Sequence, residues 1–272
     1  MIPRVLIVAG SDPIGGAGLQ ADLLTVTHLG CLGMTAATAI TVQDTSRVQA
    51  VHPLPAAWVS QQMAACLEDV GADVIKLGML GDGAVVEAVA AMLERHPTIP
   101  VVADPVLAGT GGGALLDGAG RRALLERLLP RVTLLTPNLP ETEALTGLPT
   151  RTRPQREAAA RRLTAMGVGA ALLKGGHAAA WDDGETSGET TTGEMADLLW
   201  EGREMRWFFA PRLDNGPWHG TGCMLAAATA AGLARGLALV EAVELGRRTV
   251  RQGMIHALAA GRGQKLLRPW GE

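Results

Sequence analysis

Five short motifs, glycine-rich or polar, carry the residues of this chain that could do chemistry. They follow predicted strands or open predicted helices, and they run in this order: Gly10-Ser11-Asp12-Pro13-Ile14-Gly15-Gly16-Ala17-Gly18, Asp104-Pro105-Val106, Thr136-Pro137-Asn138-Leu139-Pro140-Glu141, Leu173-Lys174-Gly175-Gly176-His177 and His219-Gly220-Thr221-Gly222-Cys223. In open parallel sheets, ligands bind in the crevice outside the carboxyl ends of the strands. We therefore expect the five motifs to converge on one crevice.

The first motif leaves several interpretations open. Residues 16–21 fit the pattern G-x-G-x-x-A, which indicates dinucleotide binding when it follows a strand and opens a helix. Two features weaken that interpretation: six residues separate the strand from the pattern, and no acidic residue follows about twenty positions on to hold a ribose. The alternatives are a turn that lets helix and strand pack closely, or one whose backbone approaches a small substrate, with Asp12 and Asp22 as acceptors.

The last motif places two glycines at a predicted helix start. Backbone N–H groups at such a start form an anion-binding concavity, which makes polyanion chemistry plausible here. The alternative is an ordinary helix entry with Thr221 as the N-cap. Cys223 falls in the first turn, where the helix dipole is expected to lower the pKa of a thiol. Its alternative role is that of a small buried hydrophobic residue.

The three remaining motifs offer charged or chelating groups, each with an ordinary structural alternative. Asn138 and Glu141 could hold a hydrated Mg²⁺ through their oxygens, although a helix capping box is the more common use of this pair. Lys174, at a strand end, could reach a phosphate, or it could be a solvated lysine. Asp104, also at a strand end, could point into the crevice or form an Asp-Pro turn.

Composition excludes several classes of protein. The 272 residues include 24 Lys+Arg and 27 Asp+Glu, a formal charge of −3, which argues against nucleic-acid binding. The pattern G-x-x-x-x-G-K-[ST] does not occur, so a P-loop kinase is excluded, and the lack of G-x-S-x-G disfavours a nucleophile-elbow hydrolase.

The cysteines and the apolar runs bear on where the protein works. The three cysteines lie far apart and form no C-x-x-C pair, which favours a reducing compartment. The apolar run at residues 5–9 is short for a signal peptide, and the longest apolar-rich stretch, residues 224–243, carries Arg235 at its middle. We expect a soluble cytoplasmic protein that spans no membrane.

The elements that must position the motifs alternate between strands and helices. Strands are expected at residues 4–9, 33–42, 73–77, 101–103, 133–135 and 169–173, and helices at 17–29, 56–70, 82–95 and 156–166. This alternation predicts an α/β fold with a parallel sheet covered by helices on both faces. Beyond it we expect a polar mobile loop at 182–194, an antiparallel edge hairpin of 195–200 and 205–210, and two helices within 222–260. Without a linker or repeat, residues 1–272 are expected to form one domain.

A set of motifs identifies a family resemblance. The stretches AGSDPIGGAGLQADL, TVQDT, KLGMLG, DPV, TPNLPE, LLKGGH and HGTGC, in this order over residues 9–223, resemble the ribokinase-like superfamily. Within it the chain is similar to the hydroxymethylpyrimidine/phosphomethylpyrimidine kinases of thiamine biosynthesis. The resemblance implies a ribokinase-like three-layer α/β/α fold and ATP-dependent phosphorylation of a small aminopyrimidine and then of its monophosphate. It also implies Mg²⁺ as a cofactor and suggests a homodimer.

The resemblance also implies roles for individual residues. Gly220, Thr221 and Gly222 would form an anion hole, with Cys223 at the catalytic position. The other implied contacts are Asp12, Gly18, Asp22, Gln43, Met79 and Val106 to the pyrimidine, Lys174, Gly176 and Asn138 to ATP, and Asp104, Asn138 and Glu141 to Mg²⁺. Gln43 could pair with an aminopyrimidine edge through one donor and one acceptor. A thiol suits both acceptors better than an aspartate would, and Cys223→Ala is expected to lose the first transfer more than the second.

Two departures and two rival functions accompany the resemblance. The family often has Lys-Ser-Gly after DPV, where this chain has residues 107–113 without a lysine, and often Thr before the motif histidine, where this chain has Trp218. One rival is a pyridoxal kinase of the same superfamily. The other is a non-catalytic pyrimidine-binding protein that kept the fold, against which the joint presence of Lys174, Asn138, Glu141 and Cys223 argues.

Overall fold

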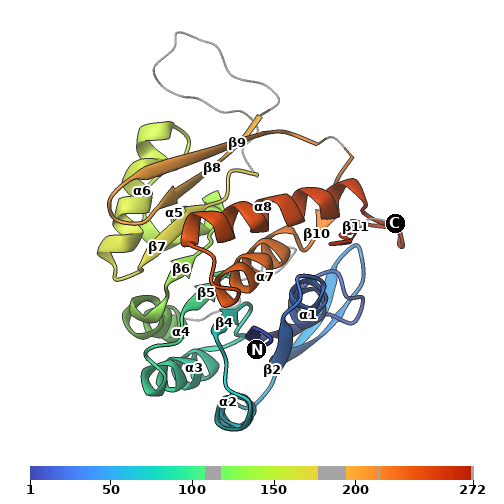
Figure 1. Cartoon of the computed structure of the whole chain (residues 1–272), viewed down its shortest axis with the longest axis vertical. Coiled ribbons are helices and arrows are strands. Elements are labelled where there is room, and N and C mark those ends of the chain that lie inside the picture. The colour runs from blue at the N-terminus through green and yellow to red at the C-terminus, as the bar shows by residue number, and fades with distance from the viewer. Residues whose placement is uncertain (108–117, 177–193, 214, 271–272) are drawn as a thin grey trace.

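A nine-stranded sheet forms the centre of the molecule (Figure 1). The computed structural model describes residues 1–107, 118–176, 194–213 and 215–270, and within them the strand order is β3-β2-β1-β4-β5-β6-β7-β8-β9. The strands are β1 (Arg4–Ser11), β2 (Leu32–Gln43), β3 (Val48–Pro53), β4 (Val74–Leu77), β5 (Val101–Ala103), β6 (Leu134–Leu135), β7 (Ala170–Leu173), β8 (Glu194–Trp200) and β9 (Met205–Pro211). The run from β2 through β7 is parallel, whereas β3 and the β8–β9 hairpin are antiparallel. This confirms the predicted sheet and its edge hairpin.

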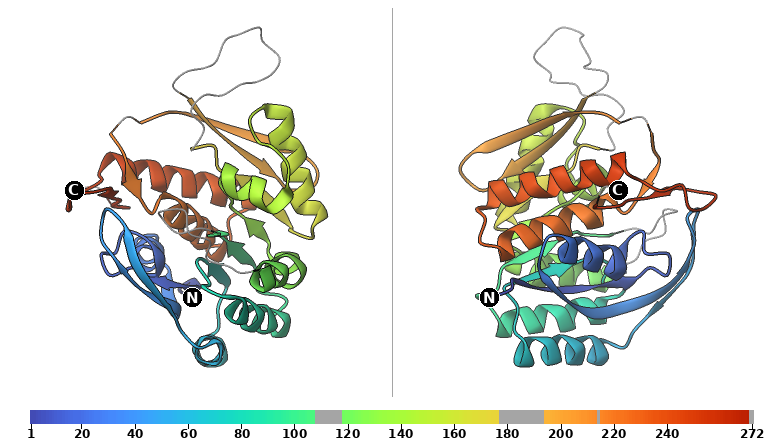
Figure 2. Two further views of the ribbon diagram at one scale, coloured as in Figure 1. Left: turned by 180° about the vertical axis from the view of Figure 1, so that it is seen from behind. Right: turned by 45° about the vertical axis from the view of Figure 1, so that its right-hand side comes forward.

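Helices cover both faces of the sheet, as predicted (Figures 1 and 2). One layer holds α2 (Ala56–Asp69), α3 (Gly83–Arg95), α4 (Gly118–Ala123), α5 (Leu139–Thr146) and α6 (Arg153–Ala165), and the other holds α1 (Gly18–His28), α7 (Thr221–Ala234) and α8 (Leu239–Ile255). Alternate strand residues face the two layers: in β1, Leu6 and Val8 join the first core, while Val5 and Ile7 join the second. Aliphatic side chains make up most of both cores, with Trp200 in the first and Phe208 in the second.

Helix α7 is buried on almost every side. Its residues Met224–Gly232 are all buried, and the segment is rich in alanine and glycine. Small side chains let α8 pack closely over it: a Cβ at Gly232 would lie 3.0 Å from the Cα of Ala242. The helix therefore lies between the sheet and α8, and this packing fixes its first turn near the carboxyl ends of the parallel strands.

Several elements differ from the sequence-based expectation. Strand β3 was not predicted, because Val48–Pro53 is a half-exposed edge segment of mixed polarity. Helix α4 was missed too, and it runs on through a π turn (Leu124–Leu128) into a 3₁₀ turn (Leu129–Arg131). For α5 only the start was predicted, by the capping box of Asn138 and Glu141. Helix α6 begins three residues earlier than predicted, because Thr152 caps it in a capping box with Gln155.

After α8 the chain forms a small second sheet beside the start of α7. Residues after α8 leave the helix, and β11 (Lys265–Leu266) pairs with β10 (Trp218–His219) just before α7. The expected helical stretch to residue 260 is therefore too long. The expected loop at 182–194 lies outside the described residues, except for Glu194, which begins β8. Among the helices described, none has the length and apolar character needed to cross a membrane.

Candidate active site

A cavity of about 870 Å³ opens at the carboxyl ends of the parallel strands. Its lining includes residues that end or directly follow β1, β2, β4, β5 and β7, and Asn138 in the loop after β6, as expected for an open α/β sheet. The sequence-predicted residues that line it are Asp12, Gly18, Gln43, Met79, Asp104, Val106, Asn138, Glu141, Lys174, Gly176, Gly220, Thr221, Gly222 and Cys223. The predicted convergence of the five motifs is confirmed, although the predicted placement of Asp22 is not.

Asp12 organises the first glycine-rich loop. Its carboxylate accepts hydrogen bonds from the backbone N–H groups of Ile14, Gly16 and Ala17 at 2.8–3.0 Å, and its Oδ2 lies 3.1 Å from Nε2 of His219. Burial opposes ionisation, but the hydrogen bonds from His219 and the backbone outweigh it, so the pKa of Asp12 lies below its usual range. Asp12 is thus a buried loop organiser at the cavity wall, and its oxygens are already engaged by its own loop.

Gly220 brings the last motif against the first. It is the N-cap of α7 with φ +85°, and a Cβ there would overlap the carbonyl oxygen of Gly16. Only glycine fits both the left-handed backbone and this close approach. Thr221 is therefore the first helical residue, and the prediction that it is the N-cap is wrong. Among the described residues no side chain caps α7, so its first-turn N–H groups are available to an anion.

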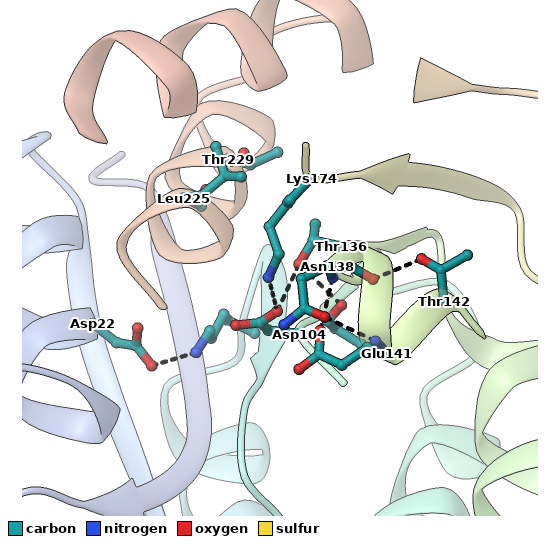
Figure 3. Close-up of polar contacts among 11 residues, drawn as sticks. Asp22, Asp104, Thr136, Asn138, Glu141, Thr142, Lys174, Leu225 and Thr229 are labelled. Carbon is teal, nitrogen blue, oxygen red and sulfur yellow. Dashed lines mark hydrogen bonds and ion pairs between the residues drawn. The ribbon is translucent and has the colours of Figure 1, made fainter. Parts of the chain in front are cut away.

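Lys174 and Asp104 form an ion pair directly beside this helix start (Figure 3). Lys174 Nζ donates to Asp104 Oδ1 at 2.6 Å, and the same oxygen accepts from Thr136 Oγ1 at 3.2 Å. A Cβ at Gly222 would lie 2.9 Å from Asp104 Oδ2 and 3.0 Å from Lys174 Nζ. Burial lowers the pKa of Lys174, but the carboxylates of Asp104 and Glu141 raise it further, so the lysine stays charged. It is not the solvated lysine of the alternative interpretation.

Asn138 and Glu141 do form the capping box, and they line the cavity as well. Asn138 Oδ1 accepts from the Glu141 N–H, and Glu141 Oε2 accepts from the Asn138 N–H, both at 2.8 Å. Burial raises the pKa of Glu141 to about 7, with Lys174 opposing and Asp104 adding to the rise. Both interpretations of this motif are thus compatible, because the capping box uses one oxygen of the Glu141 carboxylate and both side chains still border the cavity.

The donor set near Asp104 and Glu141 fits a hard cation. All of its ligand atoms would be carboxylate or amide oxygens; the pKa of Glu141 is raised chiefly by burial, and the neighbouring Asp104 carboxylate adds to the rise. In the described part of the chain, no three residues among His, Cys, Asp and Glu cluster into a ready metal cage. Such a sparse oxygen set matches Mg²⁺, which commonly keeps several waters and binds through substrate phosphates plus one or two carboxylates.

Cys223 does not have the lowered pKa expected from its place in the first turn of α7. Burial raises the pKa of the thiol to about 11, although Lys76 and the Gly18 N–H act in the opposite direction. Desolvation therefore outweighs the helix dipole, and the thiol is neutral at neutral pH.

Asp22 lies beneath the cavity and does not line it. Its side chain is completely buried, and Oδ2 accepts from Lys76 Nζ at 2.5 Å. Burial raises the pKa of Asp22 to about 6, while Lys76 opposes the rise. The residue that borders the cavity is Lys76, which sequence analysis missed although a lysine in the buried strand sequence DVIKL was a signal.

Sequence analysis also missed the cavity wall that α8 and the β8–β9 hairpin form. Arg247 of α8 donates from Nε to Asp197 Oδ2 at 2.8 Å, and its guanidinium carbon lies 5.0 Å from the centre of the Phe208 ring. Asp197 Oδ1 accepts from the Gly175 N–H at 2.8 Å. This network ties α8 and the edge hairpin to the loop that carries Lys174. The glycines at 109–113 and His177 lie outside the described residues.

A solved structure with the same architecture is a kinase. The pyridoxal kinase of Bacillus subtilis, solved as an ADP complex, is 28% identical to this chain, with a TM-score of 0.87 over 98% of this chain and 97% of that one. The fold and the cavity define a kinase of the ribokinase-like class.

Within that class, the sequence profile of the phosphomethylpyrimidine kinase family matches residues 12–268, and the chain belongs to this family. The hydroxymethylpyrimidine/phosphomethylpyrimidine kinase of Streptomyces coelicolor is 41% identical over 259 residues, which cover 95% of this chain and 90% of that protein. The thiamine biosynthesis bifunctional protein ThiED of Geobacter sulfurreducens is 41% identical over 259 residues, but this chain spans only 50% of its length.

Proposed function

We propose that this protein transfers the γ-phosphoryl group of ATP to 4-amino-5-hydroxymethyl-2-methylpyrimidine, and then a second phosphoryl group to the resulting monophosphate, in thiamine biosynthesis. The observation that carries the proposal is the contact between the two glycine-rich segments. The anion-binding start of α7 and the Asp12 loop meet at Gly220 and Gly16 within one cavity. A phosphoryl donor and a small acceptor bound there would be adjacent.

The acceptor would occupy the end of the cavity nearest β1, β2 and β4. Gln43, Met79 and Val106 border this end, and Gly18 opens α1 against it. The amide of Gln43 offers one donor and one acceptor to an aminopyrimidine edge. Met79 and Val106 offer apolar surface for the two faces of a planar ring.

ATP would occupy the end nearest β7 and α7. Lys174 supplies positive charge, Gly176 and Asn138 border the same wall, and the N–H groups at the start of α7 would bind its phosphates. In each transfer the acceptor oxygen forms a bond to the γ-phosphorus while the bond to the bridging oxygen of ADP breaks. Catalysis of this kind consists mostly of positioning and charge stabilisation. In the first transfer the hydroxyl proton leaves to solvent.

Mg²⁺ would be held by Asp104 and Glu141, with Asn138 beside them. When bound, it offsets charge on the nucleotide phosphates. In this chain Lys174 fixes the orientation of the Asp104 carboxylate, and the capping box fixes Glu141. Because of these contacts, the carboxylate groups of Asp104 and Glu141 are already oriented at the cavity before a substrate binds.

Cys223 would lie at the point of transfer as a neutral thiol. Its raised pKa means that it is no resting general base. A neutral group here places no negative charge against a phosphate acceptor, whereas a carboxylate would. This is the property that a site serving both acceptors needs. We further propose that the chain is one kinase domain that works in the cytoplasm as a homodimer.

ADP formation in a coupled assay tests the function. We expect turnover with the hydroxymethylpyrimidine and with its monophosphate, each at a higher kcat/KM than with pyridoxal. The second candidate is a pyridoxal kinase, which the TM-score of 0.87 to the Bacillus subtilis enzyme favours. A higher kcat/KM with pyridoxal would support that candidate, and no ADP with any of the three would support a non-catalytic binding protein.

A further inference from the structure

The ion pair between Asp22 and Lys76 is the most deeply buried charge pair near the cavity. Neither side chain has any exposed surface, and Lys76 Nζ lies 2.5 Å from Asp22 Oδ2. The other oxygen, Asp22 Oδ1, has no hydrogen-bond partner in the described part of the molecule. A buried pair with an unsatisfied oxygen is often no more stable than a hydrophobic pair of similar volume. Stability of the fold therefore gives no sufficient reason for this pair.

The pair lies next to the acceptor end of the cavity. Lys76 is the third residue of β4 and borders the cavity, and a Cβ at Gly78, two residues on, would lie 3.0 Å from its Nζ. Cys223 interacts electrostatically with both Lys76 and Lys174, and Asp104 interacts with the same two ammonium groups. Figure 3 shows the arrangement, with Asp22 on one side of the site and the Asp104–Lys174 pair on the other.

The two transfers make different electrostatic demands on these lysines. The first acceptor is a neutral alcohol, whereas the second is a phosphate monoester with a charge of about −1.5 to −2 at neutral pH. That charge must approach the negatively charged phosphates of ATP. Lys174 is already engaged with Asp104 at the donor end, at 2.6 Å. Lys76 is the lysine that borders the acceptor end among the described residues.

We propose that Lys76, held by Asp22, is a specificity-determining residue that admits the phosphorylated acceptor. Its positive charge, just behind the cavity surface, offsets the phosphate of the monophosphate during the second transfer and matters little for the neutral alcohol. A buried charge acts over several ångströms because the surrounding permittivity is low. This inference rests on the proposed function, since it assigns a residue to one of its two steps.

The test compares both transfers in variants that remove the pair. Lys76→Met combined with Asp22→Asn leaves no unpaired buried charge. We expect kcat/KM for the monophosphate, divided by kcat/KM for the alcohol, to fall at least about 30-fold, as expected for the loss of a charge interaction of about 2 kcal/mol. Lys76→Arg keeps the charge and should retain the ratio within about threefold. In the variant with Lys76→Met and Asp22→Asn, the Kd of the monophosphate, measured by calorimetry without nucleotide, should also rise.

A matched control lies at the other end of the same strands. Arg4→Met with Asp73→Asn removes an ion pair of 2.7 Å where β1 begins and just before β4, far from the cavity edge. This control should leave the ratio unchanged. An equal fall of both transfers in the Lys76 variant would overturn the proposal, since it would assign the pair a purely structural role. An unchanged ratio would overturn it as well.

A second variant covers failure of the double substitution to fold. Asp22→Asn alone removes the nearest carboxylate from Lys76 while Asp104 still favours its charged form, so the KM for the monophosphate should fall at least about threefold relative to that for the alcohol. A relative rise or no change would overturn the proposal. Wild-type protein that forms ADP with neither pyrimidine would contradict the proposed function instead, so the two failures are distinguishable.

Discussion

Cys223 combines two opposing influences on one side chain. It lies in the first turn of α7, where the helix dipole favours an anion, and yet burial raises the pKa of its thiol to about 11. Asp22 and Asp104 add to the rise, while Lys76 opposes it. Burial is therefore the main reason that the thiol is neutral, with the neighbouring charged groups as smaller contributions.

The raised pKa predicts slow, strongly pH-dependent alkylation of Cys223. Because only the thiolate reacts, iodoacetamide should label this residue about 100-fold more slowly at pH 8 than it labels a free cysteine, which has a pKa near 8.5. The rate should rise about tenfold per pH unit up to pH 10. Peptide mapping by mass spectrometry separates Cys223 from the other two cysteines. A rate that levels off below pH 9 would contradict the neutral thiol.

A charge at position 223 should separate the two transfers. Cys223→Asp places a carboxylate where the second acceptor must bring its phosphate, so kcat/KM for the monophosphate should fall at least about tenfold more than that for the alcohol. Cys223→Ser, which is neutral and of similar size, is the control and should change both by similar factors. If the aspartate variant loses both transfers equally, charge at this position does not decide which acceptor is used.

The site residues that sequence analysis found share a glycine- or proline-marked setting, and those it missed do not. Asp12, Asn138 and Gly220 lie in glycine- or proline-marked segments at strand ends, where the edge of a parallel sheet gathers them. Lys76 and Arg247 lie inside regular elements, and only the packing of β4 and α8 against the cavity gives them a place in the site. The position of the Asp22 side chain depends on the same packing, which places it against Lys76 and outside the cavity lining.

At the scale of elements, α7 connects the core to the site. Its buried alanine-rich body is fixed between sheet and α8, and its first turn meets the Asp12 loop through Gly220. The helix ends at a second left-handed glycine, Gly236, whose φ is +83° and where an added Cβ would meet nothing within 4 Å. The two glycines thus have the same backbone conformation and different surroundings.

These two glycines give a matched pair of variants. Each alanine substitution carries the left-handed backbone cost of about 1–2 kcal/mol. Gly236→Ala should show only that loss in denaturant unfolding and keep kcat/KM within about threefold. In Gly220→Ala the added methyl group must also push the two glycine-rich segments apart. We therefore expect kcat/KM to fall at least about 100-fold, because small displacements of catalytic groups have effects of that size. Similar kcat/KM values for both variants would contradict the role of this contact.

The elements themselves were predictable to different degrees. Buried strands such as β1 and β5 contain continuous apolar runs, and they were found at nearly their observed bounds. The edge strand β3 and the short helix α4 were not, and of α5 only the capped start was, because half-exposed or brief elements carry little periodicity and depend on their neighbours. The pairing of β11 with β10 joins residues far apart in sequence, and no local pattern indicates it.

At the scale of the whole molecule, antiparallel strands complete both edges of the parallel sheet, and one of these edges helps to close the site. Arg247 links α8 to Asp197 in β8 and to the backbone of Phe208 in β9. Asp197 in turn holds the backbone of Gly175, next to Lys174. The donor end of the cavity therefore depends on contacts among three elements distant in sequence.

Removal of this link should weaken both the fold and nucleotide binding. Arg247→Ala leaves Asp197 with one unpaired, largely buried oxygen, so the free energy of unfolding should fall by about 1–3 kcal/mol and the KM for ATP should rise. Arg248→Ala, one residue along, removes a largely exposed side chain and should change stability by less than about 0.5 kcal/mol. Equal loss of stability in both variants would contradict the link.

The most direct test of the account follows both phosphoryl groups to their products. Wild-type protein incubated with Mg²⁺, ATP and the hydroxymethylpyrimidine is sampled over time by mass spectrometry. The account predicts that the monophosphate appears first and is converted to the diphosphate, with two ATP consumed for each diphosphate formed. A monophosphate that accumulates without any diphosphate, or no phosphorylated pyrimidine at all, would contradict it.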